Sequence, residues 1–177
     1  MIDWATTTPQ QAFVPLLPSW ALCTDRFEDG AYYAARDEAV RHDHIQLNPR
    51  WARLWIIHDI DKSDAYYRHR DNMLPEPTFL SINRENGHAH SAYLLRVPVA
   101  SHDSARVAPL RLFAAVERGL RRRLNADRNY IGLLAKNPMS PRWRTEWRSR
   151  LPFDLDDLAS DLTAEEMAIE TLRRHEA

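Results

Sequence analysis

The segment Arg53-Leu54-Trp55-Ile56-Ile57-His58-Asp59-Ile60-Asp61 carries the strongest structural signal in this chain. From Arg53 to Ile60 it is rich in Leu, Trp and Ile with little polarity, which is typical of a β-strand buried on both faces. Alternate side chains of a strand point to the same face, so Asp59 and Asp61 should project side by side where this strand ends. The sequence therefore predicts a buried strand that delivers two carboxylates to one place.

Two adjacent carboxylates against an apolar wall repel each other. The pair becomes stable when it is protonated, paired with arginine or bound to a hard cation. Carboxylate oxygens suit Mg²⁺ or Mn²⁺, and two such ions form the usual clamp for phosphoryl or nucleotidyl transfer. Asp59 and Asp61 are thus candidate metal ligands. The alternative is a strand that runs into a polar turn, with both aspartates in water.

A β-hairpin with two histidines is predicted further along the chain. Thr78–Ile82 and His88–Val97 are the expected strands, and Asn86-Gly87 between them is a strong turn signal. His88 and His90 would share one strand face beside this turn. Two histidines so placed can bind a transition metal or contact phosphate, and the alternative is a pair on the surface.

The remaining pattern mixes helices with strands. Ser104–Leu124 is the clearest helix, because apolar residues recur at helical spacing and arginines occupy its last turn. Thr163-Ala164-Glu165-Glu166 matches a capping box that starts a terminal helix. The other expected elements are helices over Arg36–Arg41 and from Ser63 through His69, strands over His44–Leu47 and Tyr130–Ala135, and irregular structure over 136–153. With a clear antiparallel hairpin, this mixture favours an α+β fold over a doubly wound parallel one.

Length and composition bound the class of protein. The 177 residues suit one domain with a short appendage. Cys23 is the single cysteine, which excludes an internal disulfide framework and a Cys-rich zinc site. The apolar runs are too short to span a bilayer, and the first residues lack the basic start and apolar core of a secretory signal. These features predict a soluble, cytoplasmic protein with no membrane partner.

The net charge of −1 conceals an uneven distribution. Residues 106–150 hold 12 basic and three acidic side chains, and 11 of the 12 basic residues are arginines. Arginine suits planar, bidentate contacts to phosphate, so this central block is a candidate anion-binding face. The alternative is a solvated helix face that the acidic tail after residue 150 neutralises.

Basic and aromatic residues alternate near the end of the central block. Such interleaving can follow a phosphate backbone and stack on bases. The residues concerned are Lys136, Asn137, Arg142, Trp143, Arg144, Trp147 and Arg148. Trp143 and Trp147, four residues apart, could instead be core anchors of a short helix. The stretches His42-Asp43-His44 and Arg68-His69-Arg70 are expected to lie on the surface.

The order of these motifs resembles the archaeo-eukaryotic primase superfamily, and within it the replicase family of colicin-type plasmid replication initiator primases. The resemblance covers roughly residues 30–160. Its motifs are His44-Ile45-Gln46-Leu47-Asn48, Ile57-His58-Asp59-Ile60-Asp61, Ile82-Asn83 through Asn86-Gly87-His88-Ala89-His90, Ala126-Asp127, Tyr130 and Leu134-Ala135-Lys136-Asn137-Pro138. Their combination is fairly specific, whereas no single motif is.

This resemblance implies an RNA-recognition-like antiparallel sheet core with flanking helices and a small N-terminal α/β module. It implies a primase catalytic domain at residues 1–160, and an acidic C-terminal helix at 161–177 that would start a linker to a DNA-binding region. The implied activity is template-directed primer synthesis from nucleoside triphosphates during plasmid or mobile-element replication. The implied partners are single-stranded or origin DNA and, further, a host replication polymerase.

Carried over by position, Asp59 and Asp61 match the family's first metal-binding motif, and the resemblance implies two ions of Mg²⁺ or Mn²⁺. Asp127 matches the third acid, with Asp154 as the alternative. His90 matches the histidine that contacts the phosphates of the incoming nucleotide. The other implied contacts are His88, Lys136 and Asn137 for the nucleotide, and Arg121, Arg122, Arg142 and Arg144 for the nucleic acid.

Two other functions stay open. His88-Ala89-His90 is also the His-hydrophobic-His pattern of rolling-circle nickases, which use one metal and a tyrosine nucleophile, here Tyr130. The other function is a non-catalytic module that binds origin DNA. The pair Asp59 and Asp61 favours the primase, because a nickase has no evident use for it.

Overall fold

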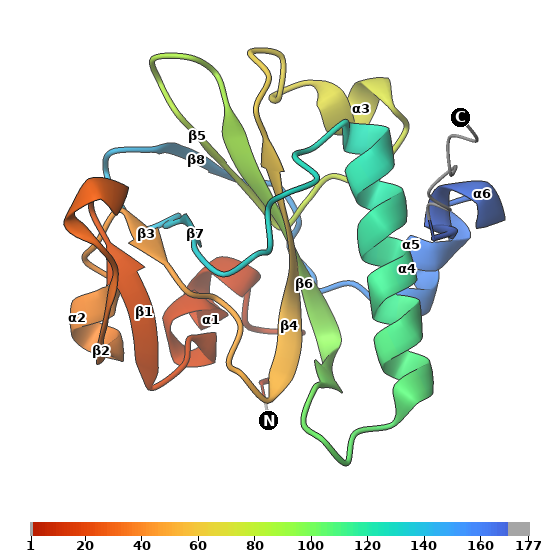
Figure 1. Ribbon diagram of the computed structural model, residues 1–177, viewed down its shortest axis with the longest axis horizontal. Coiled ribbons are helices and arrows are strands. Elements are labelled where there is room, and N and C mark those ends of the chain that lie inside the picture. Colours follow the sequence, from red (N-terminus) through yellow and green to blue (C-terminus); the bar gives the residue numbers. More distant parts are fainter. Residues whose placement is uncertain (1, 170–177) are drawn as a thin grey trace, which may run out of the picture.

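The computed structural model describes residues 2–169 as two four-stranded antiparallel sheets with six α-helices (Figure 1). The first sheet, in the order β2-β1-β3-β7, is formed by β1 (Trp20–Thr24), β2 (Tyr32–Ala35), β3 (His44–Ile45) and β7 (Ala135–Lys136). The second, in the order β4-β6-β5-β8, is formed by β4 (Ala52–Ile60), β5 (Phe79–Ile82), β6 (Ala89–Ala100) and β8 (Arg144–Trp147). The helices are α1 (Pro9–Leu16), α2 (Arg36–Ala39), α3 (Arg68–Asp71), α4 (Val107–Leu124), α5 (Leu155–Ser160) and α6 (Ala164–Met167).

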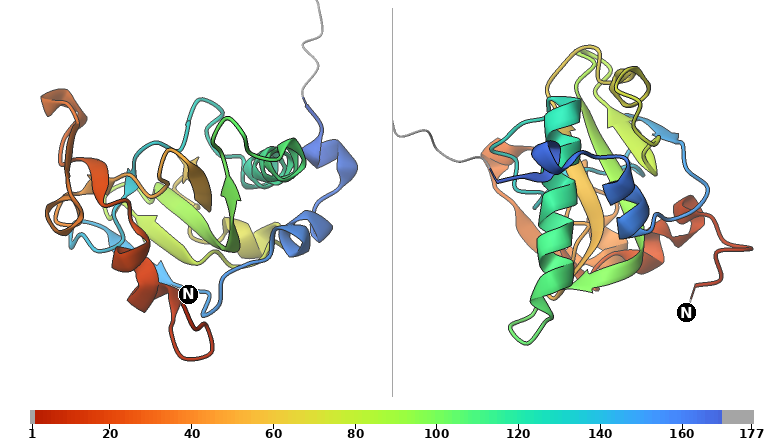
Figure 2. Two further views of the ribbon diagram at one scale, coloured as in Figure 1. Left: turned by 90° about the horizontal axis from the view of Figure 1, so that it is seen from below. Right: turned by 90° about the vertical axis from the view of Figure 1, so that its right-hand side faces the viewer.

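The second sheet is buried on both faces and separates two apolar cores. Trp55 and Ile57 of β4 pack into one core together with Phe13 of α1 and residues of the first sheet. Ile56 and Ile60 pack into the other core, beneath α4 and α5. Burying one such side chain contributes about 1.5–3 kcal/mol. Figure 2 shows α4 lying across this sheet with α5 and α6 beside it.

These elements confirm the α+β class and its main features. β4 is the predicted buried strand, and β5 and β6 form the predicted hairpin. The chain order β4-α3-β5-β6-α4, with β6 between β4 and β5, gives the RNA-recognition-like core. The capping box is present, because Thr163 and Glu166 exchange both hydrogen bonds at the start of α6. The rest of the predicted tail, residues 170–177, lies outside the described part of the chain.

Three local predictions were wrong. Only the last residue of Tyr130–Ala135 is in a strand, because the Tyr130 hydroxyl donates to the carbonyl of Leu134 and closes a loop. The helix expected from Ser63 begins at Arg68, after a series of turns. Arg144–Trp147 is neither irregular nor helical, because it extends the second sheet along β5. That pairing joins segments more than 60 residues apart, which local patterns do not encode.

The two histidine stretches expected on the surface also differ from prediction. His44 is buried between the rings of Phe27 and Trp143, and His69 is fully buried with its Nε2 3.0 Å from Ser91 Oγ. Among residues 2–169, no helix is both long and apolar enough to cross a membrane.

Candidate active site

Asp59 and His90 lie opposite each other in the ladder between β4 and β6. Asp59 Oδ1 is 3.1 Å from His90 Nε2 and 3.8 Å from Lys136 Nζ. Lys136 belongs to β7, so the first sheet contributes this cation. Strand register therefore brings together three charged or polar groups from distant parts of the chain, two of which, His90 and Lys136, are buried.

A backbone donor fixes the tautomer of His90. The amide N–H of Lys136 donates to His90 Nδ1 over 3.0 Å, so the proton of the neutral ring is on Nε2 and faces Asp59. Burial lowers the pKa of His90, and the neighbouring Asp59 opposes this only in part. His90 is thus a neutral ring whose N–H points toward the carboxylate of Asp59. Residues that orient a metal ligand through a hydrogen bond have this arrangement.

Burial acts on the pKa of Asp59 in the opposite direction to the nearby hydrogen-bond donors and cations. Burial, the largest single influence, raises the pKa of this carboxyl, but His90, Lys136 and His88 together bring the pKa below its ordinary value. Asp59 is therefore ionised at neutral pH. Its Oδ1 is buried, and the contacts with His90 Nε2 and Lys136 Nζ leave it without a well-aligned hydrogen bond. A buried, ionised oxygen with an unfilled lone pair is suited to a cation.

Two further carboxylates complete an acidic cluster. Asp59, Asp61 and Asp127 each offer an oxygen, and these atoms lie within 4.8 Å of one another. Asp127 is held there because its backbone N–H donates to the carbonyl of Asp59 over 2.8 Å. Asp154, the alternative third acid, instead pairs with Arg96 at 3.0 Å. The hard oxygen donors fit a divalent cation such as Mg²⁺ or Mn²⁺.

Two other residues expected to bind the nucleotide, His88 and Asn137, lie in different surroundings. His88 is partly exposed beside the cluster, with its Nδ1 3.1 Å from Asp61 Oδ1. Asn137 is fully buried, and its side-chain amide donates to the carbonyls of Val40 and His42, both over 2.7 Å. His88 can reach a ligand in the cluster, whereas Asn137 has a structural role that leaves its assignment to nucleotide binding without support.

The four arginines expected to bind nucleic acid each contact another group of the chain. Arg121 is near Glu117, whereas Arg122 donates to the backbone carbonyls of Glu165 and Glu166 and holds α6. Arg142 pairs with Asp43 at 2.9 Å, and Arg144 on the edge strand β8 pairs with Glu146. The assignment of these four arginines to nucleic-acid binding stays a prediction. Arg122 in addition holds the C-terminal segment against α4.

The side chain of Tyr130, the candidate nickase nucleophile, also takes part in contacts that hold the structure together. Its hydroxyl donates to the carbonyl of Leu134 over 2.8 Å, and its ring packs against His90 at a centroid distance of 5.0 Å. Burial raises the pKa of this hydroxyl well above its ordinary value. A nucleophilic tyrosine needs the opposite environment, so the geometry does not favour a nickase.

Sequence reasoning missed Asp43, which holds the segment after β7 in place. Its carboxylate accepts from Ser140 and Arg142, and its carbonyl accepts from the backbone of Asn137 and the indole of Trp143. The only signal was its position next to the His44 motif. A residue that acts through long-range hydrogen bonds has no local pattern to reveal it.

Comparison with known proteins identifies the fold and the family of this chain. A solved structure of the AEP domain of the cyanophage S-2L primase-polymerase superimposes with a TM-score of 0.58 over 81% of this chain and 88% of that chain, at 12% identity. The fold is therefore that of the archaeo-eukaryotic primases. The model of the Replicase family matches residues 16–162, and the chain belongs to this family. No curated protein matches the chain.

Proposed function

We propose that this chain is the catalytic domain of a DNA-dependent primase, which makes a short primer for replication of a plasmid or mobile element. Membership of the Replicase family and the fold of a primase-polymerase support a primase or polymerase role. The observation that carries the proposal is the convergence of Asp59, Asp61 and Asp127 around one point.

In the proposed reaction, the 3′-hydroxyl of one nucleotide attacks the α-phosphate of a nucleoside triphosphate. A new phosphodiester bond forms while the bond between the α- and β-phosphates breaks. Pyrophosphate leaves with the bonding electron pair, and the proton of the hydroxyl passes to water. Bound Mg²⁺ or Mn²⁺ would lower the pKa of the attacking hydroxyl and neutralise the leaving pyrophosphate. No covalent protein nucleophile is needed, so the side chains position groups and balance charge.

Each residue has a distinct part in this proposal. The three aspartates form the anionic cradle for the metal. His90, turned by the Lys136 amide, keeps Asp59 in place, and the buried Lys136 ammonium limits the repulsion among the carboxylates. Of the two histidines at the cluster, His88 is the more exposed and is the proposed donor to the triphosphate.

The experiment is primer synthesis on single-stranded DNA with Mg²⁺ or Mn²⁺, with labelled ribonucleotides and deoxyribonucleotides supplied separately. Asp59→Asn and Asp127→Asn should each lower the rate by about 100-fold or more, since each removes a metal ligand. Asp154→Asn is the matched control and should retain activity. Primer synthesis by Asp59→Asn at the wild-type rate would show that the cluster is not the catalytic centre.

A non-catalytic DNA-binding module gives a different result. Such a module should bind DNA equally well without divalent metal, and nucleotides should not raise its thermal stability. The proposed primase should be stabilised by a nucleoside triphosphate together with Mn²⁺.

A further inference from the structure

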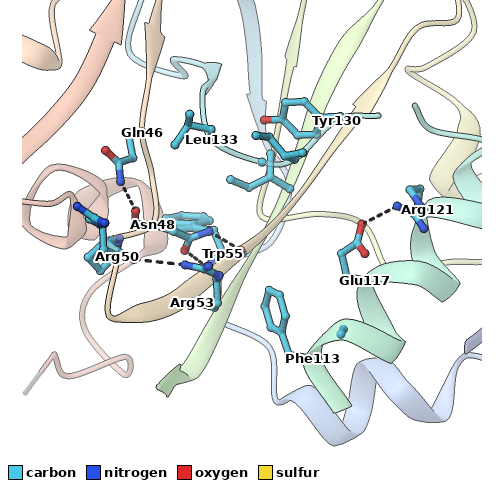
Figure 3. A pocket seen from close by; sticks show the side chains of 15 residues that line it. Gln46, Asn48, Arg50, Arg53, Trp55, Phe113, Glu117, Arg121, Tyr130 and Leu133 are labelled. Atoms are coloured by element: carbon cyan, nitrogen blue, oxygen red, sulfur yellow. Dashed lines mark hydrogen bonds and ion pairs between the residues drawn. The ribbon is translucent and has the colours of Figure 1, made fainter. Parts of the chain in front are cut away.

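A pocket of about 460 Å³ lies beside the acidic cluster and has no part in the chemistry described so far. Its walls come from β4 and the segment before it, from α4 and from the loop at residues 130–133 (Figure 3). The volume falls within the range of about 300–1,000 Å³ that is typical of small-ligand sites. The pocket is therefore large enough for part of a nucleotide chain.

Arginines stand on opposite walls of this pocket. Arg50 and Arg53 lie on one side and Arg121 on the other (Figure 3). Glu117 is the one acidic residue of the lining, and its carboxylate is 3.9 Å from Arg121. Burial raises the pKa of Glu117, which weakens its hold on a full negative charge, although Arg121 and Arg118 oppose the shift. The pocket as a whole is positive and suits an anion.

The same pocket also offers apolar surface. Phe113 of α4 is half-buried in its wall. The loop at the other side presents Ile131, which is 84% exposed, and Leu133, which is 44% exposed. Arginines next to an accessible ring and aliphatic side chains match the two parts of a nucleotide, the phosphate and the base. Unpaired bases of a single strand can use such a surface, whereas the bases of a duplex are stacked away from it.

One aromatic ring separates the pocket from the cluster. Tyr130 lines the pocket and packs against His90, which is 3.1 Å from Asp59. A smaller hollow shares Arg121 with the pocket and extends to Ala126, the neighbour of Asp127. The arginines of the pocket therefore continue, through Arg121, to a hollow lined by the residue next to Asp127.

We propose that this pocket binds single-stranded DNA, with phosphates on Arg53 and Arg121 and one base against Phe113. The inference rests on the proposed function, because a strand in this position would continue to the acidic cluster as the template. It extends that function by assigning residues from β4, the middle of α4 and its last turn to the template path.

The experiment measures binding of a fluorescent oligothymidylate by anisotropy, in EDTA so that no synthesis occurs, over a series of salt concentrations. Arg53→Ala and Arg121→Ala should each weaken binding and lower the slope of log K against log salt by about one. Arg70→Ala removes an equally positive, 70% exposed side chain outside this pocket and should bind as the wild type does. Phe113→Leu should weaken binding by about tenfold without a change of slope.

A measurement on the wild-type protein guards against misfolded variants. An oligonucleotide that carries 5-iodouracil should crosslink under ultraviolet light to peptides containing Phe113 or the loop at 130–133. Unchanged affinity in both arginine variants, or crosslinks confined to other segments, would overturn the inference. Displacement of the oligonucleotide by an equal concentration of free dATP would assign the pocket to mononucleotides and also overturn it. Failure of primer synthesis would instead contradict the proposed function and leave these binding results intact.

Discussion

Within the acidic cluster, the three carboxylates differ in what surrounds them. Asp59 is largely buried and faces two buried groups, His90 and Lys136. Asp61 is exposed, and its Oδ1 contacts Nδ1 of the partly exposed His88. Neutralising either Asp59 or Asp61 would reduce the electrostatic repulsion within the cluster. Only the loss of Asp59 leaves a buried ammonium group without its counter-charge, and such a loss is costly.

We therefore expect Asp59→Asn and Asp61→Asn to differ in the metal-free protein. Asp59→Asn should lower the free energy of unfolding by about 1–3 kcal/mol, because Lys136 loses its buried partner. Asp61→Asn should change it by less than about 0.5 kcal/mol, since exposed ion pairs contribute little. Urea unfolding in EDTA measures both. Equal effects of the two substitutions would show that Lys136 does not depend on Asp59.

At the level of elements, the site depends on the turn between β5 and β6. Gly87 has φ of +77°, and its amide donates to the carbonyl of Asn83. A Cβ at this position would lie 2.6 Å from the carbonyl oxygen of Ser63, in the loop that follows Asp61. The absence of a side chain thus lets the hairpin pack directly on that loop, which sets His88 beside Asp61.

Gly87→Ala should accordingly destabilise the protein by about 1–3 kcal/mol, through both backbone strain and the collision with Ser63. Gly132→Ala is the matched control, because Gly132 also has positive φ, +69°, but has open space where the Cβ would be. Gly132→Ala should lower the free energy of unfolding through backbone strain alone, by about 1 kcal/mol. The comparison is made by urea unfolding, and a Gly132→Ala variant as unstable as Gly87→Ala would argue against the close contact.

Over the whole molecule, several histidines are buried in neutral form. Burial, with smaller effects of His58 and Arg148, lowers the pKa of His69 to about 3. Burial, assisted by His90 and Lys136, lowers the pKa of His44 to about 4. In the unfolded chain both rings have a pKa of about 6.5. The unfolded state therefore binds protons more readily than the folded state at mildly acidic pH.

Stability should consequently be complete above about pH 6.5 and fall as the pH decreases toward 4. Each buried histidine should contribute a slope of about 1.4 kcal/mol per pH unit within this window. His69→Gln removes one titrating group, so the free energy of unfolding should fall less steeply in this variant between pH 6 and 4.5. Urea unfolding at a series of pH values tests the slopes. Identical slopes for the variant and the wild type would mean that His69 titrates normally in the folded protein.

The local sequence was sufficient for those features that depend on short-range periodicity and turn chemistry. The apolar run up to Ile60 predicted β4, Asn86-Gly87 predicted the hairpin, and helical spacing predicted α4 to within three residues of its start. The carboxylate pair followed from the same alternation, because residues two apart on a strand share a face. The family followed from the order of the motifs, which a chain preserves independently of its contacts.

Tertiary structure alone decided which distant groups surround those carboxylates. The short strand β7 pairs with β3 through only two residues, yet it places Lys136 against Asp59 and orients His90. The same holds for β8, for the burial of His44 and His69, and for the arginine-lined pocket. These features depend on contacts between segments far apart in the chain, and the energy of such contacts comes from packing and strand pairing that no single segment contains.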